Sequence, residues 1–330
     1  MKLCAYCKNP LGGKEHRKTD EHVIPNSLLK LYPKQDLSFH NDRVFVDNRG
    51  ITLSDVCASC NNGPLSELDA YGANLVKTTF FEELDFSCYG KLIPIELDTS
   101  VFIRWMLKIA YNDIRCQKLD AKHIEKCIPF ILGETNIPPA NASVLLGLHI
   151  NLTPVPEYFY QYNPLQIMHQ PRFYLDNIWN PDAKEYTIKG AKQIVCIRAG
   201  TAIAVVVLWE EGYPLDEKKQ VLRFLNKEFG FTELIPDINS YEVCPISSPT
   251  NVILSNYGHF LSKAAIEDAM LLIRCSIQMR DIGEARKEFE KLWTEDFAQE
   301  ARIMIEHDMF PGNKKKDAAY KKMIESKGKS

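Results

Sequence analysis

The stretch Cys57-Ala58-Ser59-Cys60-Asn61-Asn62 decides how the N-terminal part of this chain folds. It contains one of two CxxC pairs, and the other pair is Cys4-Ala5-Tyr6-Cys7. Two residues between the cysteines allow both thiolates of such a knuckle to reach one metal ion, and two knuckles complete a tetrahedral shell. The competing interpretation is a set of unrelated buried thiols. The two pairs predict a structural zinc site with the ligands Cys4, Cys7, Cys57 and Cys60.

The other cysteines lack paired spacing and fit best as thiols of the hydrophobic core. No apolar signal-like segment follows Met1, so we expect a reducing compartment, the cytoplasm. In such a compartment CxxC pairs bind metal more often than they form disulfides. The longest apolar run, Ala202–Trp209, is far shorter than the ~20 residues that span a bilayer, and we expect no membrane association. With Ile194–Ile197 it predicts a β-hairpin instead.

A second motif, Lys18-Thr19-Asp20-Glu21-His22-Val23-Ile24-Pro25, lies between the two knuckles. The order CxxC, EHVIP, VCxxCNN and then Leu-x-x-Leu-Asp resembles the HNH endonucleases, in particular the zinc-stapled bacterial and phage type. The resemblance covers about residues 1 to 80. It implies a ββα-metal module, in which two strands and a helix surround one divalent cation.

The resemblance also implies roles for individual residues. His22 matches the general base, and Glu21 matches the adjacent acidic ligand of the catalytic cation. Asn61 falls where many relatives place a metal-binding histidine, so the sequence departs from the family there. This departure implies weaker cation binding or a different second ligand.

The middle asparagine of the family has two candidates. Asn48 is the preferred one, with Asn41 behind it, and it would hold the loop that carries the base in shape. An ordinary turn residue in Asp47-Asn48-Arg49-Gly50 explains Asn48 equally well.

The chemistry of phosphodiester cleavage is consistent with these residue types. It requires a deprotonated water and a cation that neutralises charge on the phosphate and on the departing oxygen. An imidazole titrates near neutral pH and can take the proton of the water. The hard oxygen ligands of Glu21 and Asn61 suit Mg²⁺ or Mn²⁺ better than a second zinc.

Other histidines and basic residues of this segment have weaker assignments. A buried or surface imidazole is the competing interpretation of His22, but its neighbours favour a catalytic one. His16 fits a solvated residue, and His40 is an alternative ligand. Contacts with the DNA backbone and plain solvation are equally consistent with three basic residues, Lys14, Arg17 and Lys18.

The full chain of 330 residues, with a net charge of -3, gives no overall electrostatic sign of a nucleic-acid partner. We predict an α+β protein with an HNH-like module over residues 1–82 and a larger α+β domain over residues 83–330. Helices are expected over Ser66–Phe81, Ser100–Arg115, Leu215–Phe229 and Lys263–His307, a sheet over Ala140–Trp209, and a solvated lysine-rich tail over residues 313–330.

The leading hypothesis is a metal-dependent HNH endonuclease acting on DNA, of the kind found in bacterial or phage defence and restriction systems. Residues 83–330 would then serve recognition, regulation or homodimer formation. One alternative is a zinc module that binds nucleic acid without cutting it. Another is an interaction or ligand-sensing protein whose zinc knuckle is purely structural.

Overall fold

The computed structural model describes residues 2–32, 38–40, 43–45, 50–82, 84, 88, 91–149, 164–174, 185–246, 252–253, 303 and 314–327. The chain divides into two compact units, Met1–Asn151 with Pro164–Ser255, and Leu152–Asn163 with Asn256–Ser330. Helices and sheets both occur, which confirms the predicted α+β class. Among the described residues, no helix is long and apolar enough to cross a membrane.

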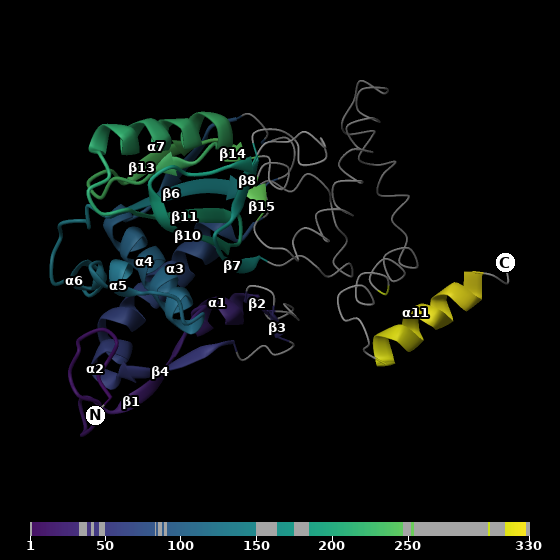
Figure 1. Cartoon of the computed structure of the whole chain (residues 1–330), viewed down its shortest axis with the longest axis horizontal. Coiled ribbons are helices and arrows are strands. Elements are labelled where there is room, and N and C mark those ends of the chain that lie inside the picture. The colour runs from purple at the N-terminus through teal and green to yellow at the C-terminus, as the bar shows by residue number, and fades with distance from the viewer. Residues whose placement is uncertain are drawn as a thin grey trace. The chain divides into compact units, whose positions relative to one another are not determined.

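The N-terminal part is organised around two antiparallel strands and the helical run that follows them (Figure 1). Strand β1 (Lys18–His22) pairs with β4 (Thr52–Cys57), with Lys18 opposite Cys57 and His22 opposite Thr52. The short helix α1 (Asn26–Leu31) follows β1. After β4 the chain continues directly into four helical segments: α2 (Ala58–Cys60), the π-helical η1 (Asn61–Leu65), α3 (Ser66–Leu75) and the π-helical η2 (Val76–Phe80).

The centre of the first unit is an eight-stranded sheet with the order β12-β6-β11-β10-β7-β2-β3, and β14 pairs with β6. The predicted hairpin is confirmed, because β10 and β11 pair along their whole length around Gly200 and Thr201. The strands are β2 (Ser38–His40), β3 (Arg43–Phe45), β6 (Ala142–His149), β7 (Leu165–His169), β10 (Ala191–Ala199), β11 (Ala202–Trp209), β12 (Thr232–Glu233) and β14 (Pro245–Ile246).

Helices cover both faces of this sheet, as Figure 1 shows. Helix α4 (Thr99–Cys116) belongs to the core on one face, and α7 (Leu215–Phe229) belongs to the core on the other. Every residue of β11 is buried, as a strand with covered faces requires. The continuous apolar run in the sequence reflects this position.

Helix ends follow from local sequence. The Asp98 carboxylate caps α4 by accepting a hydrogen bond from the Val101 N–H at 3.1 Å. Helix α7 ends at Gly230, whose φ of 74° is accessible to glycine at little cost. Both helices agree with the ranges predicted from their apolar periodicity.

The N-terminal part shares its hydrophobic core with the sheet. One cluster of buried side chains contains Cys57 and Leu68 together with Val195 and Leu208. At the end of η2, the Phe80 carbonyl accepts a hydrogen bond from the Thr201 N–H at 2.8 Å, at the tip of the hairpin. The boundary predicted at residue 82 therefore falls within the first unit.

The remaining elements are short, apart from the C-terminal helix α11 (Lys314–Lys327). They are β5 (Ile93–Glu96) paired with β13 (Ser240–Val243), the sheet of β15 (Val252–Ile253), β8 (Arg172–Tyr174) and β9 (Glu185–Tyr186), and the helices α5 (Lys122–Glu125) and α6 (Ile128–Ile131). Helix α11 replaces the irregular tail expected from the lysine content, and its Met323 is buried. The helix predicted over Lys263–His307 lies outside the described residues except at residue 303.

The packing of α3 against the Trp105 ring of α4 depends on Gly72. A methyl group at this position would lie 2.1 Å from the Trp105 ring, well inside van der Waals contact. We therefore expect Gly72→Ala to lower the free energy of unfolding by about 1–3 kcal/mol, because the ring has to move within a packed core. Urea unfolding measures the change. Asn74→Ala, on an exposed position of the same helix, should stay within about 0.5 kcal/mol of the parent, and equal losses in both variants would contradict the prediction.

Candidate functional site

The four predicted cysteines form one cluster. Their Sγ atoms all lie within 4.8 Å of one another, with 3.9 Å between Cys4 and Cys60 and 3.7 Å between Cys7 and Cys57. A tetrahedral zinc with Zn–S bonds of about 2.3 Å requires sulfur–sulfur distances of about 3.8 Å. A disulfide would place two sulfurs about 2 Å apart. The cluster therefore has the geometry of a four-cysteine metal site and is compatible with structural zinc.

Backbone hydrogen bonds hold the two knuckles together. The Ala5 N–H donates to the Asp55 carbonyl at 2.9 Å, which joins the first knuckle to β4. The Cys57 N–H donates to Cys4 Sγ at 3.3 Å, as knuckle amides commonly do to a ligand sulfur. The second knuckle forms where β4 continues into α2. Strand β4 ends at the ligand Cys57, and helix α2 ends at the ligand Cys60.

The electrostatics of the cluster favour a bound cation. Burial works to raise the pKa of Cys57, but hydrogen bonds from His16, Ser59 and the Cys60 backbone lower it to about 5. Burial and the Cys57 sulfur raise the pKa of Cys60 well above its usual range. Burial also raises the pKa of Cys7. One thiolate thus opposes ionisation of the next, and a dication would favour all four thiolates together.

His22 lies half-buried at the end of β1. The next residue donates its N–H to the Ile51 carbonyl at 2.8 Å, which fixes the end of the strand. Gly50 lies close to the imidazole, because a methyl group on Gly50 would be 3.5 Å from His22 Cδ2 and 2.7 Å from Leu29 Cδ1. His22 is therefore only partly buried, and the backbone just after it is held by a hydrogen bond.

Glu21 has a different environment from the one that the resemblance implies. Only 2% of the residue is exposed, and its carboxylate lies 2.5 Å from the Lys108 ammonium. Glu21 enters the core, whereas Asp20 is exposed and His22 is half-buried; the β1–β4 register shifts between Thr19 and Glu21, so Asp20 lies at an irregularity of the strand. As a result, Glu21 is engaged in a buried ion pair instead of being open to a cation beside His22.

Lys108 connects three elements of the core. Its ammonium also lies 2.7 Å from both carboxylate oxygens of Asp69 in α3, and it is fully buried. Burial works to lower the pKa of Lys108, but the carboxylates of Asp69 and Glu21 raise it. Burial is the main cause of the raised pKa of Glu21, and Lys108 opposes that shift.

Asn61, the residue that the resemblance implies as a cation ligand, is bonded to β1 through its amide nitrogen. The amide donates to Thr19 Oγ1 and to the Asp20 carbonyl, both at 3.0 Å. These bonds tie the start of the helical run to the strand that carries His22. The predicted Asn48 and its alternative Asn41 lie outside the described residues, and His40 is described only as a backbone position in β2.

Residues of α4 complete the surroundings of β1, and the motif analysis did not identify them. They are Lys108, Asn112 and Arg115, which meet Glu21, the His22 carbonyl and Asp55 respectively. Their spacing of four and three residues places them on one side of a helix. Polar residues at this spacing within an otherwise apolar helix were a signal in the sequence.

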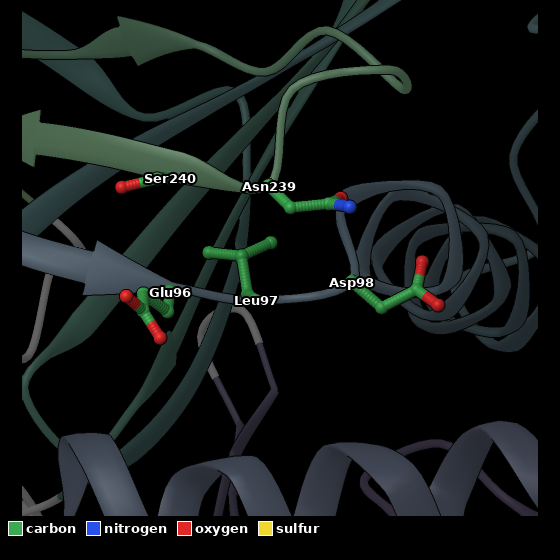
Figure 2. A pocket seen from close by; sticks show the side chains of 5 residues that line it. All are labelled: Glu96, Leu97, Asp98, Asn239 and Ser240. Carbon is green, nitrogen blue, oxygen red and sulfur yellow. The ribbon is translucent and has the colours of Figure 1, made fainter.

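A pocket lies at the opposite end of α4 from Asn112, and Figure 2 shows its lining side chains. Its polar groups take part in capping the helix: Asn239 Oδ1 accepts a hydrogen bond from the Thr99 N–H at 3.2 Å, and Asp98 is the N-cap. The other lining residues are Glu96, Leu97 and Ser240. Because Asp98 and Asn239 already bind the start of α4, we assign these polar lining groups a structural role.

Comparisons with known proteins add no family assignment. No family model, no curated protein and no solved structure matches the chain. Within the described part of the chain, the four cysteines are the only group of three or more His, Cys, Asp or Glu side chains placed to hold a metal ion. The cysteine cluster is therefore the functional feature that the structure establishes.

The first prediction from this site concerns metal content. Protein purified without added metal should contain about one zinc per chain by elemental analysis. Cys57→Ala should lose the zinc and lower the melting temperature, because binding of a structural zinc contributes directly to folding. The buried Cys196, which lies in β10 away from the cluster, is the control: Cys196→Ala should retain the zinc. A folded parent protein without metal would contradict the assignment.

The second prediction concerns the Lys108 ion pairs. Lys108→Met leaves Glu21 and Asp69 without a countercharge and should cost about 3–5 kcal/mol of unfolding free energy at pH 7. Because burial raises the pKa of Glu21, its ionised form is the destabilising one, and the loss should narrow as the pH falls from 7 to about 5. Urea unfolding at the two pH values measures this.

The matched control for Lys108 is Lys126→Met. Lys126 pairs with Glu211 at the surface, where both side chains are at least half exposed. Its replacement should change stability by at most about 1 kcal/mol at either pH. A loss in Lys108→Met that is the same at both pH values would show that packing, and not charge, accounts for the effect.

Proposed function

We propose that this chain is a metal-dependent endonuclease of the HNH type that hydrolyses phosphodiester bonds of DNA. The observation that carries the proposal is the position of His22. It lies partly exposed at the end of a strand, on an arrangement of two strands and a helix stapled by four cysteines. Asn61, at the start of the helical run, is bonded to the same strand.

In this proposal the His22 imidazole accepts the proton of the attacking water. The neutral ring acts as the base, and the bonds that hold the end of β1 keep it in place. A divalent cation, Mg²⁺ or Mn²⁺, would neutralise charge on the phosphate and the departing oxygen.

Asp20 replaces Glu21 as the carboxylate ligand in our proposal. Glu21 does not fit that role because Lys108 occupies its carboxylate in the core. Asp20 is exposed, lies two residues before His22 where the β1–β4 register shifts, and its backbone carbonyl accepts a hydrogen bond from the Asn61 amide. Asp20 and Asn61 would therefore supply the oxygen ligands of the cation.

Exposed basic residues near the strand support a nucleic-acid substrate. Lys14, Arg17 and Lys18 are all exposed, and Lys18 is the first residue of β1. Contacts of this kind with phosphates position a protein on DNA without reading its sequence. The basic side chains would thus hold the backbone next to His22.

A second candidate function is favoured by one specific observation. The buried ion pair of Glu21 removes the carboxylate that the HNH resemblance implies as a ligand. A zinc module that binds nucleic acid without cutting it would have this feature. Such a module would shift DNA in a gel with or without Mg²⁺ and would leave plasmid intact.

The test of catalysis is conversion of supercoiled plasmid in Mg²⁺, Mn²⁺ or EDTA. We expect cleavage in either metal and none in EDTA. His22→Ala should lower the cleavage rate on the order of 10²–10⁴-fold, because the general base is lost while zinc and DNA affinity remain. Asp20→Asn should weaken cation binding, and higher Mn²⁺ should partly restore its rate.

Thr52→Ala is the control for the strand itself, because Thr52 is the exposed partner of His22 across the β1–β4 pair. It should cleave at close to the parent rate. Full activity in His22→Ala would remove this residue from the mechanism. An intact plasmid together with a gel shift that does not need metal would favour the binding module.

A further inference from the structure

Asn112 is a fully buried amide in the middle of the N-terminal core, and it uses both ends of its side chain. Its nitrogen donates to the His22 carbonyl at 3.2 Å and to Glu21 Oε1 at 3.1 Å. Its oxygen accepts from Tyr6 OH at 2.8 Å and from Arg115 Nη1 at 3.1 Å. An amide that makes four hydrogen bonds in the core has one well-defined orientation.

These bonds connect the zinc knuckle to the strand of His22. Tyr6 lies between the ligands Cys4 and Cys7, and its ring packs edge-on against Tyr111 at 5.1 Å between centroids. The Tyr111 hydroxyl donates to the Ala5 carbonyl at 3.0 Å, so α4 holds the knuckle at two points. Through Asn112, the same helix reaches the backbone of His22.

The direction of the contact matters for His22. Asn112 binds the backbone carbonyl of His22, on the core side of β1, and leaves the half-exposed imidazole free to act. The other backbone restraint, from Val23 to Ile51, lies one residue further along the strand. The His22 peptide is thus held from α4 and from the neighbouring segment at once.

We propose that Asn112 is the positioning residue for His22: it fixes the strand end that carries the imidazole and links it to the zinc knuckle through Tyr6. This inference rests on the proposed nuclease function for its effect on rate. Its structural part, restraint of the end of β1, can be measured without any cleavage. A displacement of about 1 Å in a catalytic group can cost on the order of 10²-fold in rate.

The test uses Asn112→Asp, which keeps the shape and the oxygen that faces Tyr6 and Arg115. It replaces the donor nitrogen with an oxygen that opposes the His22 carbonyl and the Glu21 carboxylate. We expect kcat to fall about 10- to 100-fold with KM and zinc content unchanged. Hydrogen exchange of the Val23 amide should become faster, while amides of β10 and β11 keep their protection.

A second variant and a control keep the test decisive if Asn112→Asp folds poorly. Tyr6→Phe removes one bond to Asn112 and keeps the ring contact, and it should lower kcat about threefold with faster exchange at Val23. Gln117→Ala is the matched amide control, because Gln117 lies just beyond α4 and its amide donates to Asp113 of the same helix. It should leave both readouts unchanged.

The outcomes separate this inference from the proposed function. A parent protein that cuts DNA, with unchanged kcat and unchanged Val23 exchange in the folded variants, would overturn the positioning role alone. A parent protein that does not cut DNA would overturn the proposed function, and exchange at Val23 would then decide the structural link by itself. Loss of zinc and of folded signal in both variants would make Asn112 purely architectural and would also overturn the assignment.

Discussion

The Lys108 ammonium, held between the carboxylates of Glu21 and Asp69, is the interaction on which the N-terminal part of the structure depends. It joins β1, α3 and α4, with Lys108 and Glu21 buried and Asp69 partly exposed. A buried charge is tolerated only when it is paired and hydrogen-bonded, so the three elements must meet in one arrangement for the core to form. The Trp105 indole N–H of α4 also donates to the Asp69 carboxylate, at 3.2 Å.

The cysteine cluster and the Lys108 network divide the stabilisation of this region between them. The cysteine cluster fixes the end of the β1–β4 pair at which β1 begins and β4 ends, since Cys57 is the last residue of β4 and lies opposite Lys18. The network fixes the other end, near Glu21 and His22. Between these two points, the buried apolar side chains of the strands belong to the hydrophobic core that the central sheet shares.

The Lys108 network has a direct consequence for the chemistry that we propose. It turns Glu21 inward, whereas Asp20 stays exposed and His22 stays partly exposed. A strand can supply both a structural ion pair and candidate catalytic groups because neighbouring side chains point in different directions. Helix α4 contacts both residues from the core side, through the Lys108 ammonium at Glu21 and through the Asn112 side-chain amide at the His22 carbonyl.

The sequence by itself determined the features that depend on local spacing. The CxxC pairs predicted the cysteine cluster because two residues between ligands fix each knuckle, and a tetrahedral shell needs two knuckles. Apolar periodicity predicted α4 and α7, and the continuous apolar run predicted β11 within its hairpin. Only the tertiary structure decided the partners of Glu21 and Asn61. Their hydrogen bonds join residues 91 and 42 positions apart in the chain, and no local sequence pattern specifies which polar side chains meet over such separations. Which face of β1 enters the core is set by packing against α4, and that choice determines which side chains stay open for chemistry.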